Sequence, residues 1–122
     1  MLEKFCFVIG GFFSGSTTVK IFEKDNRFYK NYQGDYNHIG EDYTEEISAE
    51  EVSVFEKRLS ELGIYELKDQ YFDDSVLDGT QWELKYKTKD AKCKKVSGSN
   101  AYPDCWTRLL SAIGVLVPEI LE

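Results

Sequence analysis

The chain has 122 residues and a formal net charge of −7, from 15 basic and 22 acidic side chains; 42% of the residues are hydrophobic and 15% aromatic. This length and apolar content predict a single globular domain, residues 1–122, and the many aromatic residues exclude a disordered chain. The negative charge repels phosphate backbones, so we expect no nucleic-acid partner.

The charge is unevenly distributed along the chain. Residues 35–83 contain 15 acidic and 3 basic side chains, a net charge of −12, whereas residues 85–95 contain 6 basic and 1 acidic, a net charge of +5. We therefore expect strong local fields of both signs, and an acidic surface of this kind speeds the capture of a basic partner.

An apolar run at residues 5–13 is typical of a buried strand. It is long enough for the core of a signal peptide, but the charges of Glu3 and Lys4 cancel and no A-x-A cleavage site follows. No stretch approaches the roughly 20 apolar residues of a membrane-spanning helix. We therefore expect a cytoplasmic protein without membrane association.

Three cysteines, Cys6, Cys93 and Cys105, are widely spaced. An odd number without a C-x-x-C pair favours reduced thiols in the cytosol over a disulfide framework. A bridge between Cys93 and Cys105 is the alternative for an exported protein.

The first half of the chain predicts an antiparallel hairpin or meander. Alternating apolar residues and turn-forming residues place strands at 5–13, 17–23 and 27–32, a turn at 24–26, a polar loop at 34–40 and a short strand at 43–47. A helix then begins at Ser48, which forms a capping box with Glu51. Its apolar stripe is Val52, Phe55, Leu59 and Leu62. Gly63 supplies the left-handed residue that ends it.

The second half predicts another hairpin and a final helix. Trp82, Leu84 and Tyr86 alternate with polar residues as in a strand with one buried face, and residues 92–97 return as its partner. Pro103 suits the first position of a helix, and Pro118 ends it. The stripe of this helix is Trp106, Leu109, Leu110, Ile113 and Leu116. Residues 65–72 are ambiguous, and one more helical turn is one interpretation of them.

These elements indicate an α+β fold. We expect a single, mainly antiparallel sheet of 4–6 strands with two helices packed on one face, because both helices carry one apolar stripe and the strands have polar outer sides. Phe55, Trp82 and Trp106 should meet in one core.

The glycine-rich turn after the first strand approaches a phosphate-binding loop. Gly10, Gly15, Ser16 and Thr17 match its spacing, but Ser16 replaces the lysine and a strand follows in place of a helix. A plain hairpin turn is the better interpretation.

Acidic residues and the single histidine do not complete a metal or catalytic site. An EF-hand starting at Asp74 would place Val76 and Lys85 where oxygen ligands are required. His38 is the only histidine, and the cysteines offer no zinc spacing. We therefore expect no cofactor, metal ligand or catalytic residue, although a Cys–His pair that meets only in space stays open.

Two further groups have a structural and a functional interpretation. Tyr29, Tyr32, Tyr36 and Tyr43 cluster around the polar loop; they suit ordinary sheet packing, and also an interface or a sugar site, with Tyr36 as a candidate contact. Lys85, Lys87 and Lys89 share one strand face, where lysines protect a sheet from unwanted pairing or face acidic residues of the same molecule.

The segments Asp78-Gly79-x-x-Trp82 and Gly98-x-Asn100-x-x-Pro103 resemble a group of small uncharacterised bacterial proteins with D-G-x-x-W before a hairpin and G-x-N-x-x-P after it. The resemblance covers about residues 78–116. It implies a bacterial source and an α+β domain, and it implies no activity. Exported and lipid-anchored members exist, but the lack of a recognisable signal argues against that location here.

Physically, most of these motif residues suit scaffolding. Asn100 can bond to backbone near the helix start, and Trp82 supplies a large buried ring. The functional interpretation is that Asp78, Asn100 and Tyr102 line a shared pocket, because polar loop residues at one end of a sheet often bind ligands.

The sequence therefore favours a non-enzymatic binding domain, for example an immunity-type inhibitor of a basic protein partner. The alternative is a small hydrolase or transferase with a site at the strand ends, near Asp78, Tyr102 or His38. A monomer and a homodimer that uses an exposed sheet face or edge strand are both compatible with the sequence.

Overall fold

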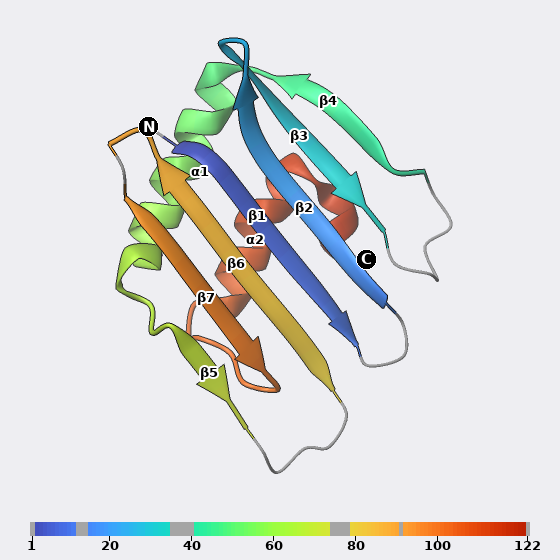
Figure 1. Ribbon diagram of the computed structural model, residues 1–122, viewed down its shortest axis with the longest axis vertical. Helices are drawn as coiled ribbons and strands as arrows, with labels where there is room; N and C mark the ends of the chain where they lie inside the picture. Colours follow the sequence, from blue (N-terminus) through green and yellow to red (C-terminus); the bar gives the residue numbers. More distant parts are fainter. Residues whose placement is uncertain (1, 12–14, 35–40, 74–78, 91, 122) are drawn as a thin grey trace.

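The computed structural model describes residues 2–11, 15–34, 41–73, 79–90 and 92–121. Seven strands, two α-helices and two 3₁₀ turns follow one another in this part of the chain (Figure 1). In order they are β1 (Leu2–Gly11), β2 (Gly15–Lys24), β3 (Arg27–Gln33), β4 (Tyr43–Ile47), α1 (Ala49–Glu61), η1 (Ile64–Glu66), β5 (Gln70–Phe72), β6 (Thr80–Thr88), β7 (Cys93–Ser99), α2 (Trp106–Leu116) and η2 (Pro118–Leu121).

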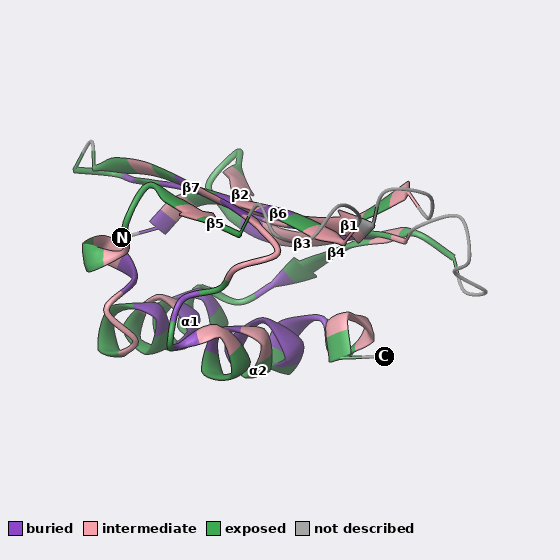
Figure 2. Cartoon of the chain, turned by 90° about the horizontal axis from the view of Figure 1, so that it is seen from below, coloured by how far each residue is buried: buried purple, intermediate pink, exposed green. Residues whose placement is uncertain are grey.

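The molecule has two layers. All seven strands form one sheet in the order β4-β3-β2-β1-β6-β7-β5, and every neighbouring pair is antiparallel except β5 and β7. Both α-helices lie on the same side of this sheet, which leaves its other face open (Figure 2). The predicted α+β class is confirmed, but the expected 4–6 strands were too few.

The strand that sequence reasoning missed is β5. Its three residues are too few to show a period of two, and they form a strand because they pair in parallel with Ser97–Ser99 of β7. The helical turn considered for residues 65–72 exists only at the start of that range, as η1, and the end of the range forms β5.

The hairpin between β2 and β3 follows directly from its turn residues. Asp25 and Asn26 both have positive φ, 55° and 64°. A two-residue turn with two left-handed residues matches the right-handed twist of the flanking strands, and Asp and Asn tolerate that conformation. This turn sets the register that places Val19 and Ile21 on the helix side of the sheet.

Helix α1 begins and ends as predicted. The Ser48 hydroxyl accepts a hydrogen bond from the Glu51 amide at 3.0 Å, and the Glu51 carboxylate accepts one from the Ser48 amide at 3.2 Å. At the other end Gly63 adopts φ 75°, and its amide donates to the Ser60 carbonyl at 3.0 Å. Such a left-handed residue is easiest for glycine.

Helix α2 begins three residues later than the sequence suggested. Pro103 starts the turn that leads into the helix, and its carbonyl accepts a hydrogen bond from the Trp106 amide at 3.0 Å. The helix ends at Leu116, before Pro118 as predicted, because proline cannot donate to the next helical bond. Pro118 then opens η2.

The core lies between the sheet and the helices. Phe55 from α1 packs edge-on against Phe5 of β1, with ring centroids 5.1 Å apart. Trp106 from α2 lies 4.9 Å from Trp82 of β6. Phe55 and Trp82 are buried in one hydrophobic cluster, and Trp106 packs against it. The predicted meeting of these three rings in one core is confirmed.

The three cysteines are free. Cys6 is half-buried, Cys93 is exposed and Cys105 is buried, so the alternative of a Cys93–Cys105 bridge is wrong for this structure. Burial raises the pKa of the Cys105 thiol, which keeps it protonated and poorly reactive.

Within the described residues, neither helix has the length and apolar character needed to cross a bilayer.

Alkaline conditions should destabilise the fold through its buried phenols. Burial raises the pKa of Tyr86 from 10.0 to about 12. The folded state thus favours the neutral phenol, and the stability that this provides is intact below pH 10 and is lost as the pH rises through the folded value. Urea unfolding between pH 8 and about 12 should show this loss, and Tyr86→Phe should reduce it. Identical pH profiles for the two proteins would contradict the assignment.

Candidate functional site

The structure describes two of the four residues that the sequence predicted as contacts. Tyr36 and Asp78 lie outside the described residues, as does His38. Asn100 and Tyr102 follow β7 at the end of the sheet where β6 begins. Each has a packing role.

Asn100 forms the corner that follows β7. It adopts φ 58°, and its amide donates to the Thr80 carbonyl at 2.9 Å, which ties the end of β7 to the start of β6. A side chain at Gly79 would collide with it, because an added Cβ would lie 1.8 Å from the Asn100 Oδ1. These contacts support the scaffolding interpretation for the Gly79 and Asn100 positions of the two motifs.

Tyr102 belongs to a chain of aromatic rings. Its ring lies 4.7 Å from that of Trp106, and 41% of the residue is exposed. Trp82 lies on the other side of Trp106 and donates its indole N–H to the Ala101 carbonyl at 2.9 Å. Such offset and tilted rings stabilise a core beyond the area they bury. Tyr102 therefore covers the edge of the core.

Because Gly98 has no side chain, the indole ring of Trp82 fits against the backbone at this position. A Cβ at Gly98 would lie 2.0 Å from the Trp82 Nε1, and both residues are buried. Gly98→Ala should therefore displace the indole and lower the free energy of unfolding by about 1–3 kcal/mol. Urea titration followed by tryptophan fluorescence would measure this. Ser97→Ala is the matched control, because Ser97 points to the open face; equal stability of the two variants would contradict the close contact.

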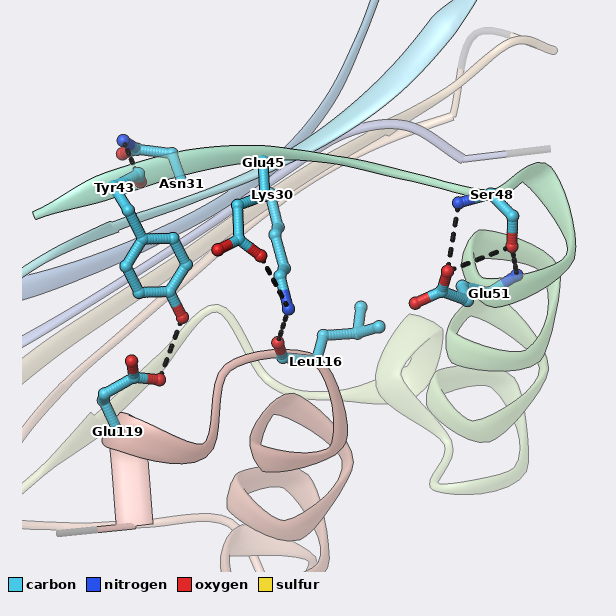
Figure 3. Close-up of polar contacts among 8 residues, drawn as sticks. All are labelled: Lys30, Asn31, Tyr43, Glu45, Ser48, Glu51, Leu116 and Glu119. Carbon is cyan, nitrogen blue, oxygen red and sulfur yellow. Dashed lines mark hydrogen bonds and ion pairs between the residues drawn. The ribbon is translucent and has the colours of Figure 1, made fainter.

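Four exposed glutamates lie in β4 and in the first turn of α1, which follows β4 along the chain. Glu45 and Glu46 are exposed on β4, and Glu50 and Glu51 are exposed in the first turn of α1. Acidic residues at a helix N-terminus are stabilised by the helix dipole, and Glu51 also caps the helix (Figure 3). We call these four residues the acidic corner. They lie within the strongly acidic half of the sequence.

The inner side of β4 is tied to the end of α2. Lys30 reaches across from β3 and donates to the Leu116 carbonyl at 2.6 Å, while its ammonium lies 3.8 Å from the Glu45 carboxylate (Figure 3). A cation at the last carbonyls of a helix is favourable for the helix dipole.

A second tie joins β4 to η2. The Tyr43 hydroxyl donates to the Glu119 carboxylate at 2.9 Å. Burial, followed by this hydrogen bond, raises the pKa of Tyr43 well above its ordinary value. The Tyr43 and Lys30 contacts hold β3 and β4 against the end of α2 and η2.

An apolar groove lies next to the acidic corner, between the outer sides of α1 and α2. It has a volume of about 230 Å³ and contains Val54, Ala112 and Val115. Val54 is 45% exposed and Val115 is 63% exposed. Glu50, Glu51 and Arg58 line the same groove. We call this surface the acid-rimmed groove.

Sequence reasoning missed this groove, although a signal existed. Val54 and Val115 are apolar residues that lie off the core stripes of their helices. Single exposed apolar residues are common, but several that meet in one patch point to a contact outside the core. The approach of α1 to α2 that makes these residues neighbours could not be read from the periodicity.

The predicted lysine stripe is only partly formed. Lys85 and Lys87 are exposed on β6, where they pair with Glu83 and Glu3 at 3.1 and 3.4 Å. Lys89 leaves this face, because it pairs with Glu23 at 2.6 Å and lies over the Phe28 ring. These lysines therefore face acidic residues of the same molecule.

In the part of the chain that the structure describes, no three His, Cys, Asp or Glu side chains are arranged to hold a metal ion. The first part of the failed EF-hand pattern, residues 74–78, lies outside the described part. Comparison with protein-family models and with curated proteins found no match to this chain.

Proposed function

We propose that this protein is a non-enzymatic binding domain that captures a basic protein on the acid-rimmed groove and the acidic corner, as an immunity-type inhibitor would. The observation that carries this proposal is the pair of exposed valines between α1 and α2 with glutamates directly beside them. Protein interfaces commonly have this anatomy, in which an apolar centre excludes water and a polar rim surrounds it.

The acidic corner keeps most of its field. Glu46 pairs with Arg27 at 3.4 Å, but both side chains are more than half exposed, so water screens the pair. Glu45 shares Lys30 with the Leu116 carbonyl. Glu50 and Glu51 make no ion pair with other described residues. A basic partner would therefore be attracted from a distance and held in register on contact.

The groove would contribute apolar contact area to the binding free energy, in addition to the attraction between charges. Its volume of about 230 Å³ suits one or two aliphatic or aromatic side chains of a partner. Burying Val54 and Val115 would remove apolar area that is now in contact with water. We therefore expect the partner to present an apolar residue flanked by lysines or arginines.

The competing proposal is a hydrolase or transferase at the strand ends near Asp78 and Tyr102. Of its candidate residues, Asp78 and His38 lie outside the described part of the chain, and Tyr102, which is 41% exposed, packs its ring against Trp106. The binding proposal has the better geometric support, because Val54 and Val115 are exposed and lie outside the hydrophobic core.

Removing the charge of the acidic corner should slow capture. The test variant combines Glu45→Gln, Glu46→Lys, Glu50→Lys and Glu51→Gln; glutamine at 45 avoids repelling Lys30, and glutamine at 51 keeps the helix cap. The partner would be recovered by pull-down from the host, or taken as the product of a neighbouring toxin-like gene. The association rate at low salt should fall about 10- to 100-fold.

The control variant has the same change in charge at exposed sites away from the corner, through Glu61→Lys, Glu66→Lys and Asp104→Lys. Its association rate should stay near that of the unmodified protein. Val115→Asp should instead speed dissociation, because it places a charge in the groove. If the corner variant and the control bind alike, the acidic corner is not the binding surface.

A further inference from the structure

A second hollow lies on the opposite side of the molecule, on the open face of the sheet. It crosses five strands and has a volume of about 600 Å³. Its floor and walls come from residues that are direct neighbours across the sheet. One row runs Ser16, Gly10, Gln81, Ser99 and Phe72; the next runs Val8, Glu83, Ser97 and Gln70. We call this hollow the open-face trough.

The trough exists because small residues meet along these rows. Gly10, Ser97 and Ser99 add little above the backbone, so the middle of the open face is low. Phe72 stands at the end of the first row on the edge strand β5, and 70% of it is exposed. Its neighbour Tyr71 points to the helix side and contacts Trp82. Because successive strand residues point to opposite faces, the Phe72 ring lies on the open face.

The polar groups of the trough are already oriented. The Gln81 amide donates to the Ser99 hydroxyl at 2.8 Å. The Glu83 carboxylate is held between Lys85 and Lys95, at 3.1 and 3.6 Å from their ammonium groups. Side chains fixed in this way lose less conformational entropy when a ligand binds.

The chemistry of the lining selects the ligand class. Among the described residues that line the trough, Glu83 alone is charged, and Lys85 and Lys95 lie beside its carboxylate and balance its charge. The described lining therefore favours a neutral ligand. Serine hydroxyls and glutamine amides both donate and accept hydrogen bonds, as a polyhydroxyl ligand requires. An exposed aromatic ring offers a flat apolar face to the C–H side of a sugar ring.

We infer that the open-face trough binds a short neutral oligosaccharide that lies across the strands, with one sugar ring against Phe72. Five strands span about 19 Å at their usual spacing, so the row accommodates several linked rings. This site is separate from the acid-rimmed groove, because the groove is lined by α1 and α2, which lie on the other side of the sheet (Figure 2).

The test is a titration of the isotope-labelled full chain followed by amide NMR shifts. The probes are cellotriose, maltotriose and triacetylchitotriose, each up to about 10 mM, a range that detects the weak affinity of a shallow site. A neutral, serine- and glutamine-rich decapeptide is the fourth probe. We expect at least one sugar to give saturable shifts at Phe72, Gln81, Ser97 and Ser99.

Two variants and a control connect these shifts to the trough. Phe72→Ala should weaken binding about three- to tenfold by removing the ring contact, and Ser97→Tyr should abolish it by filling the hollow. Phe22→Ala is the control, because Phe22 lies on the open face against Tyr29 and outside the trough. The acidic-corner variant should bind the sugar normally.

Three outcomes would overturn the inference: no saturable shifts with any sugar, shifts that fall outside the trough, or sugar binding that survives both variants. If the decapeptide alone shifts β5, the trough is instead a strand-pairing site for a peptide. Each variant's folding is checked by its unperturbed amide spectrum in the absence of ligand.

Discussion

Burial of one face of the sheet beneath two helices is the constraint on which the other features depend. Side chains alternate between the two faces of each strand, and the register fixes the strands relative to one another. Phe5, Val19 and Leu84 therefore face the helices together. The helices in turn can cover that face only by turning their stripes inward. This packing leaves off-stripe residues such as Val54 and Val115 exposed, and it leaves the other side of the sheet uncovered (Figure 2).

The two exposed faces inherit different chemistry from this arrangement. The helical face combines apolar residues with glutamates, because the first turn of α1 favours acids and also lies against β4. The open face combines small polar residues with lysines that are paired with glutamates. The net charge of −7 does not reveal this difference, because it is the sum over two surfaces that lie on different sides of the sheet.

Local sequence signals predicted most of the fold. The capping box at Ser48, the left-handed Gly63 and the alternation around Trp82 each depend on a few neighbouring residues, and each has the expected geometry. The missed features are non-local. Strand β5 forms only through β7, and the strand count failed for that reason. The start of α2 was misplaced because Pro103 also suits the turn before a helix.

The candidate sites were harder to predict than the elements. Asn100 and Tyr102 were expected to line a pocket, and their polar groups and loop positions allowed it; the structure gives them contacts with Gly79 and Trp106 instead. The groove and the trough each combine residues from segments distant in the sequence. Their members could be identified only after the register and the helix packing were known.

The central position of β1 also governs how the chain can assemble. Its neighbour on one side is β2, the next strand along the chain. Its neighbour on the other side is β6, in which Tyr86 pairs with Phe5 although about 80 residues separate them in the sequence. The pairing of β1 with β6 can therefore form only after β6 has been synthesised, and it requires the ends of the long segment between them to come together. Until then one edge of β1 has no strand beside it, and an unpaired edge of this kind favours aggregation of the incomplete chain.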